Sequence, residues 1–238
     1  MMELQTFTAE REWTVDGIPV LSAAIALPEP IPMSDKFSRR IHRYYQLQCR
    51  AYLQYCEKHL FPLAAQEYRA ALANSAPLPL FRAELNYQIT YHDSHFLSLY
   101  TQSSETAPHQ HLKLRRGDTW DLSTGYPVPL SDFFPDRSPW KRQLMKLASE
   151  EIQKQERTGL SKYHENWKKM LRRHFNSQNY YLTENGLAFF FPMYAIAPAE
   201  EGIPTFLLPY GKDGPSFYVP AADRSEPEKS ARSQTGAP

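Results

Sequence analysis

Residues 180–210, YYLTENGLAFFFPMYAIAPAEEGIPTFLLPY, contain the clearest structural pattern in the sequence. Within it, Asn185-Gly186 separates two apolar runs, which is the pattern of a β-hairpin with a type I′ turn. Residues 187–191 are apolar at every position, so we expect this strand to lie inside a sheet covered on both faces. Residues 205–208 resume an extended run. The stretch therefore predicts a hairpin, a loop and a closing strand.

The loop between the last two strands, residues 192–204, is expected to be rigid because prolines and a glycine recur in it. A preformed loop loses little conformational entropy on binding, and loops often carry function. We therefore predict that this loop contacts a partner, with Tyr194 as its aromatic anchor. The alternative is that Tyr194 and Ile196 only close the edge of the core. The predicted binding residues are Pro192, Tyr194, Pro198, Glu200 and Gly202.

The order of these features resembles the RsiV and PdaC ectodomain family: an apolar strand, a Tyr followed by Ile-Ala-Pro, then Gly-Ile-Pro and a closing strand. Upstream, WDLSTG at 120–125 and VPLSDFF at 128–134 are similar to a second family segment, and residues 86–100 resemble its central strand pair. The resemblance covers roughly residues 12–210. It implies partner contact near the 192–202 loop.

RsiV-type members are membrane-anchored anti-sigma factors that sense lysozyme, and PdaC-type members carry the domain beside a peptidoglycan deacetylase. This sequence departs from the family at Met193, where Pro is usual, and at Ala199, where an aromatic is usual. It also shows no sigma-binding segment, transmembrane helix or deacetylase domain. We therefore expect neither function to transfer directly.

The composition is that of a globular chain, with 42% hydrophobic and 13% aromatic residues among 238. A net charge of +1 gives no field that would indicate nucleic acid as a partner. No apolar window suits a membrane span or a signal peptide, so the expected location is cytoplasmic. We expect an N-terminal lead at 1–12, one domain at 13–219 and a disordered tail at 220–238.

Helical periodicity begins after Ser34, which could cap a long helix. Pro62 should kink this helix, whose second piece can run to Ala73. Cys49 and Cys56 lie seven residues apart in it, about 10 Å along the axis, too far for a disulfide between them. Both are therefore expected to be reduced core residues.

Strands are predicted at 13–27, as a hairpin broken by Asp16-Gly17, and at 82–92, where apolar and polar residues alternate strictly. Runs at 96–101, 109–115 and 119–122 can continue the meander, with turns at 93–94, 103–108 and 117–118. Further helices should start at Ser138-Pro139, ending at Gly159, and at Ser161. The predicted fold class is α+β, an antiparallel meander packed against several helices in a single domain.

No catalytic, metal or cofactor site is predicted. His109 and His111 share a strand face, but Lys113 and Arg115 on that face would repel a cation. Asp93-Ser94-His95 reads as a turn rather than a triad. The sequence contains no nucleophile elbow, phosphate loop or His-Glu-x-x-His motif.

The first functional hypothesis is a non-catalytic binding or sensor module that recognises a protein or a cell-wall glycan through the loop and the neighbouring sheet edge. The second is a hydrolase acting on wall-derived glycans, by analogy with the deacetylases. The third is a cytoplasmic interaction protein that uses a basic helix face. This face would comprise Lys162, Lys168, Lys169, Arg172 and Arg173.

Overall fold

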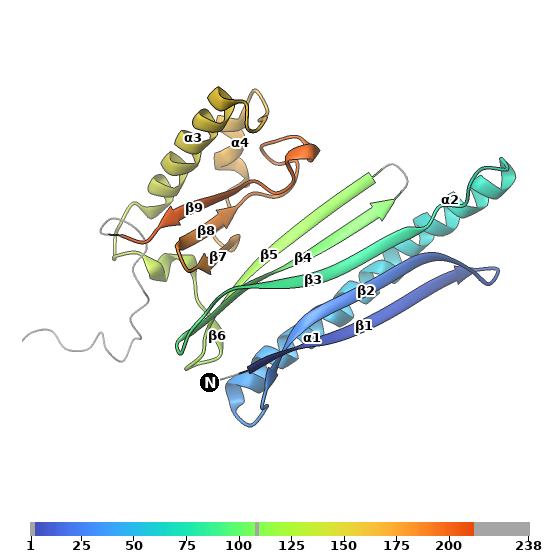
Figure 1. Ribbon diagram of the computed structural model, residues 1–238, viewed down its shortest axis with the longest axis horizontal. Helices are drawn as coiled ribbons and strands as arrows, with labels where there is room; N and C mark the ends of the chain where they lie inside the picture. The colour runs from blue at the N-terminus through green and yellow to red at the C-terminus, as the bar shows by residue number, and fades with distance from the viewer. Residues whose placement is uncertain (1–2, 108–109, 212–238) are drawn as a thin grey trace, which may run out of the picture.

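The computed structural model describes residues 3–107 and 110–211, which form two sheets and their covering helices (Figure 1). The first sheet has six strands in the order β1-β2-β3-β4-β5-β6, and the second has three in the order β7-β8-β9. The strands of the first sheet are β1 Glu3–Val15, β2 Ile18–Ile31, β3 Phe81–His92, β4 Phe96–Ala107, β5 Gln110–Asp121 and β6 Tyr126–Pro127. Those of the second are β7 Tyr180–Thr183, β8 Gly186–Phe190 and β9 Thr205–Pro209.

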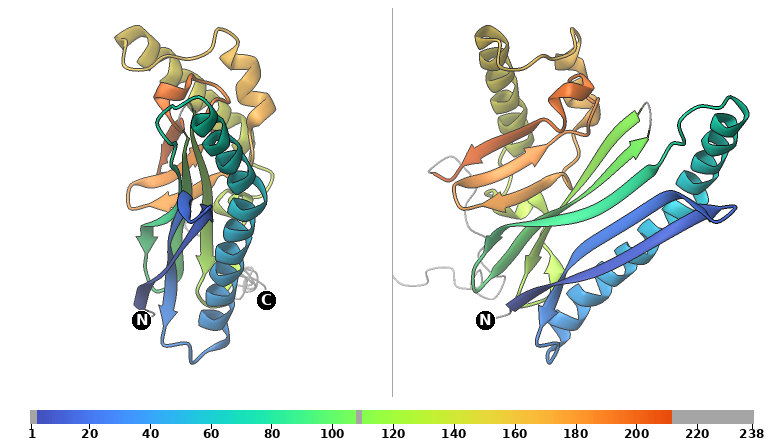
Figure 2. Two further views of the ribbon diagram at one scale, coloured as in Figure 1. Left: turned by 90° about the vertical axis from the view of Figure 1, so that its right-hand side faces the viewer. Right: turned by 45° about the vertical axis from the view of Figure 1, so that its right-hand side comes forward.

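The predicted α+β class is confirmed. All neighbouring strands pair antiparallel except β2 and β3, which are parallel. A parallel pair needs a crossover connection, and two consecutive helices provide it: α1 Lys36–Tyr55 and α2 Phe61–Ala73. They lie along one face of the first sheet, whereas the second sheet lies on the other side of β3–β5 (Figures 1 and 2).

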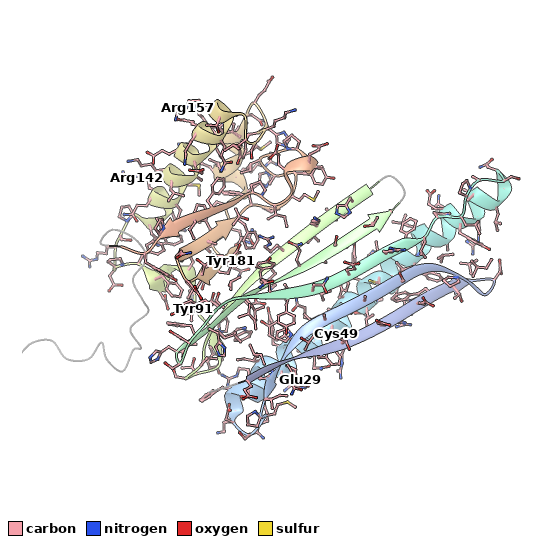
Figure 3. The ribbon with its side chains drawn as sticks, viewed as in Figure 1. Glu29, Cys49, Tyr91, Arg142, Arg157 and Tyr181 are labelled. Atoms are coloured by element: carbon pink, nitrogen blue, oxygen red, sulfur yellow. The ribbon has the colours of Figure 1, made fainter. Side chains whose placement is uncertain are left out.

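The start of α1 differs from the sequence prediction. Asp35, not Ser34, is the N-cap, and its carboxylate accepts the backbone N–H groups of Phe37 and Ser38 at 2.8 and 2.7 Å. The predicted irregularity near Pro62 takes the form of a π-helical turn, Cys56–Leu60, immediately before α2. Pro62 is the second residue of α2, but Tyr55, Cys56, Leu60 and Phe61 all keep right-handed helical backbone angles. Its missing N–H therefore falls inside a continuous helix, where a proline removes a helical bond. Cys49 (Figure 3) and Cys56 are both free and buried.

The boundary placed between residues 12 and 13 falls inside β1, so the expected N-terminal lead is a strand from Glu3 onwards. β1 is the outer strand of the sheet and is mostly exposed, which explains why its first part looks like a polar lead. The turn to β2 is Asp16-Gly17, where both residues have positive φ, 51° and 80°, as a type I′ turn requires. The boundary at 219 and the tail at 220–238 lie outside the described residues.

The turn predicted at Gly117-Asp118 is wrong, because β5 runs without interruption from Gln110 to Asp121. Gly117 is there for another reason. A Cβ at this position would collide with the backbone carbonyl of Tyr180 in β7. The glycine therefore permits a close approach between the two sheets rather than a change of chain direction.

The hairpin predicted around Asn185-Gly186 forms, but not with the predicted turn. The two-residue loop is Glu184-Asn185, since Thr183 pairs with Gly186. Asn185 does not have a positive φ, and Gly186 has φ 158°, so this is no type I′ turn. Gly186 instead makes room for the backbone of Leu208 in β9. β8 is buried at every position, as the apolar run predicted.

Two further helices cover the second sheet, α3 Trp140–Thr158 and α4 Trp167–His174 (Figure 1). Pro139, not Ser138, is the N-cap of α3, and no side chain caps it. Gly159 ends α3 in the left-handed conformation, φ 66°, as predicted. The helix expected from Ser161 starts only at Trp167. Short 3-10 turns lie at Leu130–Phe133 and Ala199–Glu201.

The two sheets meet where β7 packs against β4 and β5. The hydroxyl of Ser98 in β4 accepts the Leu182 N–H at 2.8 Å and bonds the Thr119 hydroxyl at 2.8 Å. Tyr181 lies between the sheets near Tyr100, with ring centroids 5.1 Å apart (Figure 3). This junction fixes the position of the 192–204 loop beside β5.

Candidate binding site

The 192–204 loop, which joins β8 to β9, is held at several points. Across its base, the Phe191 N–H donates to the Pro204 carbonyl at 2.9 Å. The segment before α4 holds its middle: the His164 N–H donates to the Ile196 carbonyl at 3.0 Å, and the Glu201 carboxylate accepts the Lys162 N–H at 2.8 Å. The loop is therefore preformed, as its prolines predicted.

Tyr194 has the most unusual backbone of this loop, with φ 67°. An aromatic L-residue in the left-handed region costs roughly 1–2 kcal/mol and is a conformational outlier. Its side chain is 48% exposed. The residue thus combines a strained backbone with a ring that is half in solvent.

The loop also covers part of the outer edge of β5. The Met193 sulfur accepts the Lys113 N–H at 3.2 Å, and the Tyr194 hydroxyl donates to the His111 carbonyl at 3.3 Å. Two backbone groups of an otherwise open edge strand are satisfied in this way. Ile196 is fully buried, as the core alternative expected, but Tyr194 is not.

The other predicted binding residues lie on the same loop at different depths. Pro192 and Glu200 are exposed, whereas Pro198 and Gly202 are partly buried. Glu200 belongs to the 3-10 turn, and Gly202 ends it with φ 69°. The predicted residues thus share one loop, without converging on a single point that the structure defines.

Sequence reasoning missed a groove of about 760 Å³ beside β5. One wall is β5 from Arg115 to Thr119, and the opposite wall comes from residues 127–131, the start of α3 and residues 177–180. Trp140 and Lys141 contribute from α3. Because its walls come from several separate segments between residues 115 and 180, no local motif could indicate this groove.

Asp118 lines this groove but does not supply a carboxylate to it. Its two oxygens accept the hydroxyls of Tyr44 and Tyr45, at 2.8 and 3.4 Å, and the Arg116 Nε at 3.3 Å. Tyr45 also accepts the Trp120 Nε1–H at 3.0 Å. Burial raises the pKa of Asp118, and Arg116 opposes this. The carboxylate is therefore part of the packing of α1 on the sheet.

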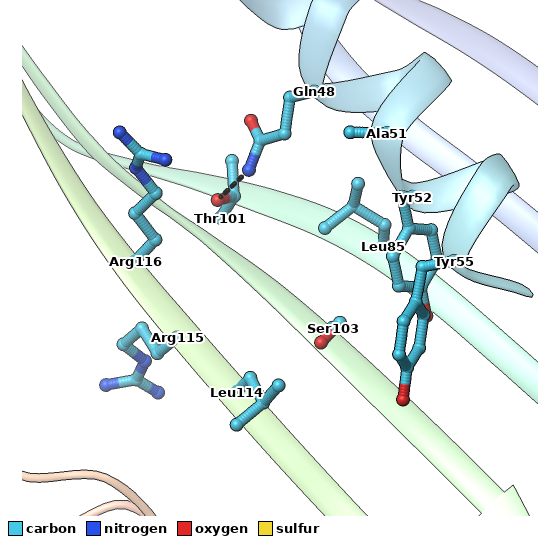
Figure 4. Close-up of a pocket in the computed structure, with 10 residues that line it drawn as sticks. All are labelled: Gln48, Ala51, Tyr52, Tyr55, Leu85, Thr101, Ser103, Leu114, Arg115 and Arg116. Atoms are coloured by element: carbon cyan, nitrogen blue, oxygen red, sulfur yellow. Dashed lines mark hydrogen bonds between the residues drawn. The ribbon is translucent and has the colours of Figure 1, made fainter. Parts of the chain in front are cut away.

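A smaller groove of about 280 Å³ lies between α1 and β4–β5 (Figure 4). The Gln48 amide donates to the Thr101 hydroxyl at 2.8 Å across it. Tyr52, Tyr55 and Leu114 provide its apolar part. Its titratable side chains are those of Tyr52, Tyr55, Arg115 and Arg116.

The outer face of α4 carries a cluster of exposed cations, four of the five that the sequence predicted; the fifth, Lys162, precedes the helix. They line a shallow open hollow of about 630 Å³, and within the described residues none forms an ion pair. The opposite face of the helix is buried through Trp167 and Leu171. The cluster comprises Lys168, Lys169, Arg172 and Arg173.

The described residues hold no group of three or more His, Cys, Asp or Glu arranged to bind a metal ion. His109 lies outside them. Asp93 accepts the N–H groups of His95 and Phe96 at 2.8 and 2.6 Å, which is the predicted turn. Burial raises the pKa of Asp93, but the hydrogen bonds to its carboxylate lower it by more, so the pKa lies below its usual value.

Residues 131–211 match the model of a family described as "Protein of unknown function (DUF3298)". This part contains α3, α4, the second sheet and the 192–204 loop. No curated protein matches the chain in sequence. No helix in the described part of the chain is long and apolar enough to cross a membrane.

Two crystal structures of DUF3298 family proteins are similar over most of the chain. The one from Bacteroides fragilis NCTC 9343 has a TM-score of 0.61 and 16% identity, and the match covers 88% of this chain and 90% of that chain. The one from Pseudomonas aeruginosa PAO1 has a TM-score of 0.54 and 12% identity, covering 88% and 91%. At these identities the likeness shows a common fold.

Proposed function

We propose that the chain is a non-catalytic binding or sensor module of the RsiV-like type. Its partner is a protein or a cell-wall glycan, recognised through the 192–204 loop and the adjacent edge of β5. The observation that carries the proposal is Tyr194, an aromatic residue held at a positive φ with its ring half exposed. Glycine would hold this turn without strain, and strained residues concentrate at functional sites.

The anchoring of the loop supports this proposal. Its bonds to residues 162 and 164 and to β5 hold it before any partner arrives. A partner would therefore not have to order the loop, which lowers the cost of association. Tyrosine is also one of the residue types that most often dominate interface energies.

A hydrolase acting on wall-derived glycans is the weaker alternative. Such an enzyme needs an acid and a base that reach the substrate. The larger groove offers Asp118, but its oxygens are directed to tyrosines of α1 and to Arg116. The basic face of α4 supports the third hypothesis, a charge-driven interaction surface, because its cations lack ion-pair partners among the described residues.

The test compares Tyr194→Gly with Tyr194→Phe, using lysozyme as the protein probe and soluble peptidoglycan fragments as the glycan probe. Tyr194→Gly removes the ring and also relieves the strained φ. We expect binding of one probe to fall by roughly tenfold or more, while the melting temperature stays equal or rises. Tyr194→Phe keeps the ring and should retain most of the binding.

Leu72→Ala is the control, because it removes another exposed large side chain, which belongs to α2 and not to the loop or to β5. It should leave binding unchanged. Two results oppose the proposal: binding that survives Tyr194→Gly, or a clear drop in melting temperature in that variant. The second result would assign Tyr194 to closure of the β5 edge.

A further inference from the structure

The outer edge of β5 is covered at both ends and open between them. β6 pairs only with Trp120 and Asp121, and beyond it the Thr119 carbonyl accepts the Val128 N–H at 2.8 Å. At the other end, Tyr194 bonds the His111 carbonyl and Met193 bonds the Lys113 N–H.

The direction of the backbone groups follows from these contacts. Residues 111, 113 and 119 all direct N–H or C=O groups away from β4. The register with β4 continues from Gln110 to Asp121 without a bulge. In an antiparallel pair, outward and inward residues alternate, so Arg115 and Gly117 also direct both their backbone groups outwards.

The outward groups of this stretch have no hydrogen-bond partner within the part of the chain that the structure describes. They are the N–H and C=O of Arg115 and of Gly117, together with the Lys113 carbonyl and the Thr119 N–H. Thr119 is buried, at 2% exposure, so the part of this row that another chain could reach runs from Lys113 to Gly117, whose residues are partly or fully exposed. Unpaired groups of this kind are a template for another strand. The 760 Å³ groove runs along the same stretch, from Arg115 to Thr119.

The charge around the groove is positive. The side chain of Arg116 is 62% exposed, and Lys141 on the opposite wall is also exposed. The one carboxylate of the lining, Asp118, is buried and bonded to Tyr44, Tyr45 and Arg116. Alternate side chains of a strand share one face, so acidic residues at alternate positions of an incoming strand would meet the cation on one wall.

We propose that the partner of this module is a protein that contributes an extended acidic segment, which adds as a strand to β5 between Lys113 and Gly117. This inference rests on the proposed function, because it uses the edge beside the 192–204 loop. A strand pairs residue by residue at about 3.3 Å per residue, so the open edge from Lys113 to Gly117 takes about five residues. Covered ends restrict the site to a short segment, which protects this edge from sheet-to-sheet aggregation.

The probe is a capped heptapeptide that alternates valine and glutamate. Amide hydrogen exchange and chemical shifts report on the backbone directly. We expect the N–H groups of Arg115 and Gly117 to be protected and shifted by the peptide, because they point to the open edge. Those of Leu114 and Arg116, which point towards β4, should change little.

A pair of variants at one position isolates the backbone contribution. Arg115→Ala and Arg115→Pro both remove the side-chain bonds to Gln102 and Thr205. Only the proline removes the outward N–H, and it takes no bond from the β4–β5 ladder. Peptide binding should weaken roughly tenfold more in Arg115→Pro than in Arg115→Ala.

A second measurement leaves the protein unchanged and so holds even if Arg115→Pro does not fold. Two heptapeptides are compared, one N-methylated at the odd-numbered amides and the other at the even-numbered amides. Only alternate N–H groups of an added strand point towards β5, so one of these peptides should lose binding and the other should keep it. A peptide with lysine in place of glutamate should bind more weakly than the parent, and more so at low salt.

Equal binding of both methylation patterns, or no binding of the parent peptide at millimolar concentration, overturns strand addition. If strand addition fails while Tyr194→Gly still weakens lysozyme or peptidoglycan binding, the proposed function stands and only its binding mode is wrong. If Tyr194→Gly also has no effect on binding, both the proposed function and the strand addition are wrong.

Discussion

Gly117→Ala should destabilise the protein strongly, although alanine is a small residue. A Cβ at position 117 would overlap the carbonyl oxygen of Tyr180 and lie 2.7 Å from its carbonyl carbon. Carbon atoms pack at about 3.5–4.0 Å, so β5 and β7 would have to separate. Overpacking of this kind costs roughly 1–3 kcal/mol. Separation would also weaken the bond from Leu182 to Ser98, worth about 1 kcal/mol, which gives about 2–4 kcal/mol in total.

Urea denaturation followed by circular dichroism measures this change, with thermal melting as a second probe. Gly211→Ala is the matched control, since none of the residues that the structure describes lies within 4 Å of a Cβ built there. It should change the unfolding free energy by less than about 0.5 kcal/mol. A Gly117→Ala variant as stable as this control would refute the close packing of β7 on β5.

The remaining predictions concern single positions in the first sheet, α1 and the loop. Ile89 faces α1 but is only partly buried, so Ile89→Ala should cost about 1–2 kcal/mol, below the range for a fully buried isoleucine; an unchanged melting temperature would contradict this facing. Asp35→Ala should cost about 1 kcal/mol at neutral pH through the lost cap, and Asp35→Asn much less. Backbone and side-chain bonds from Ser38 lower the pKa of Asp35 below 3.8, so its contribution is present above that pH and is lost as the pH falls through the folded-state pKa. An Asp35→Ala cost that does not shrink in acid would show that the carboxylate charge is irrelevant to the cap. Pro198→Ala, at a partly buried position, should weaken partner binding less than Tyr194→Gly, which competition binding can measure.

The elements that sequence predicts best are those whose own residues determine their environment. The alternation of apolar and polar residues in β3 indicates a strand with one buried face, and the apolar run of β8 indicates a strand with two buried faces. The α1–α2 crossover follows from helical periodicity, with Pro62 marking the irregularity. In each case the local pattern and the final packing agree.

The errors occur where a distant segment decides the local structure. Gly117-Asp118 has the composition of a turn, yet the glycine is required by Tyr180, more than sixty residues away. Asn185-Gly186 likewise has the composition of a type I′ turn, but Gly186 is required by the backbone of Leu208. The sequence alone does not distinguish a glycine that adopts a positive φ from one that lets a neighbouring backbone approach closely.

The same dependence governs the candidate binding site, because neither half of the chain contains it alone. The open edge belongs to β5 in the first sheet, whereas Met193 and Tyr194, which limit that edge, belong to the loop of the second sheet. The packing of β7 on β5 at Gly117 brings the two together. A substitution that loosens this packing should therefore displace the loop from the edge, even at a distance from Tyr194. Binding and the docking of the two sheets are thus linked, and the residues between the sheets contribute to recognition without touching a partner.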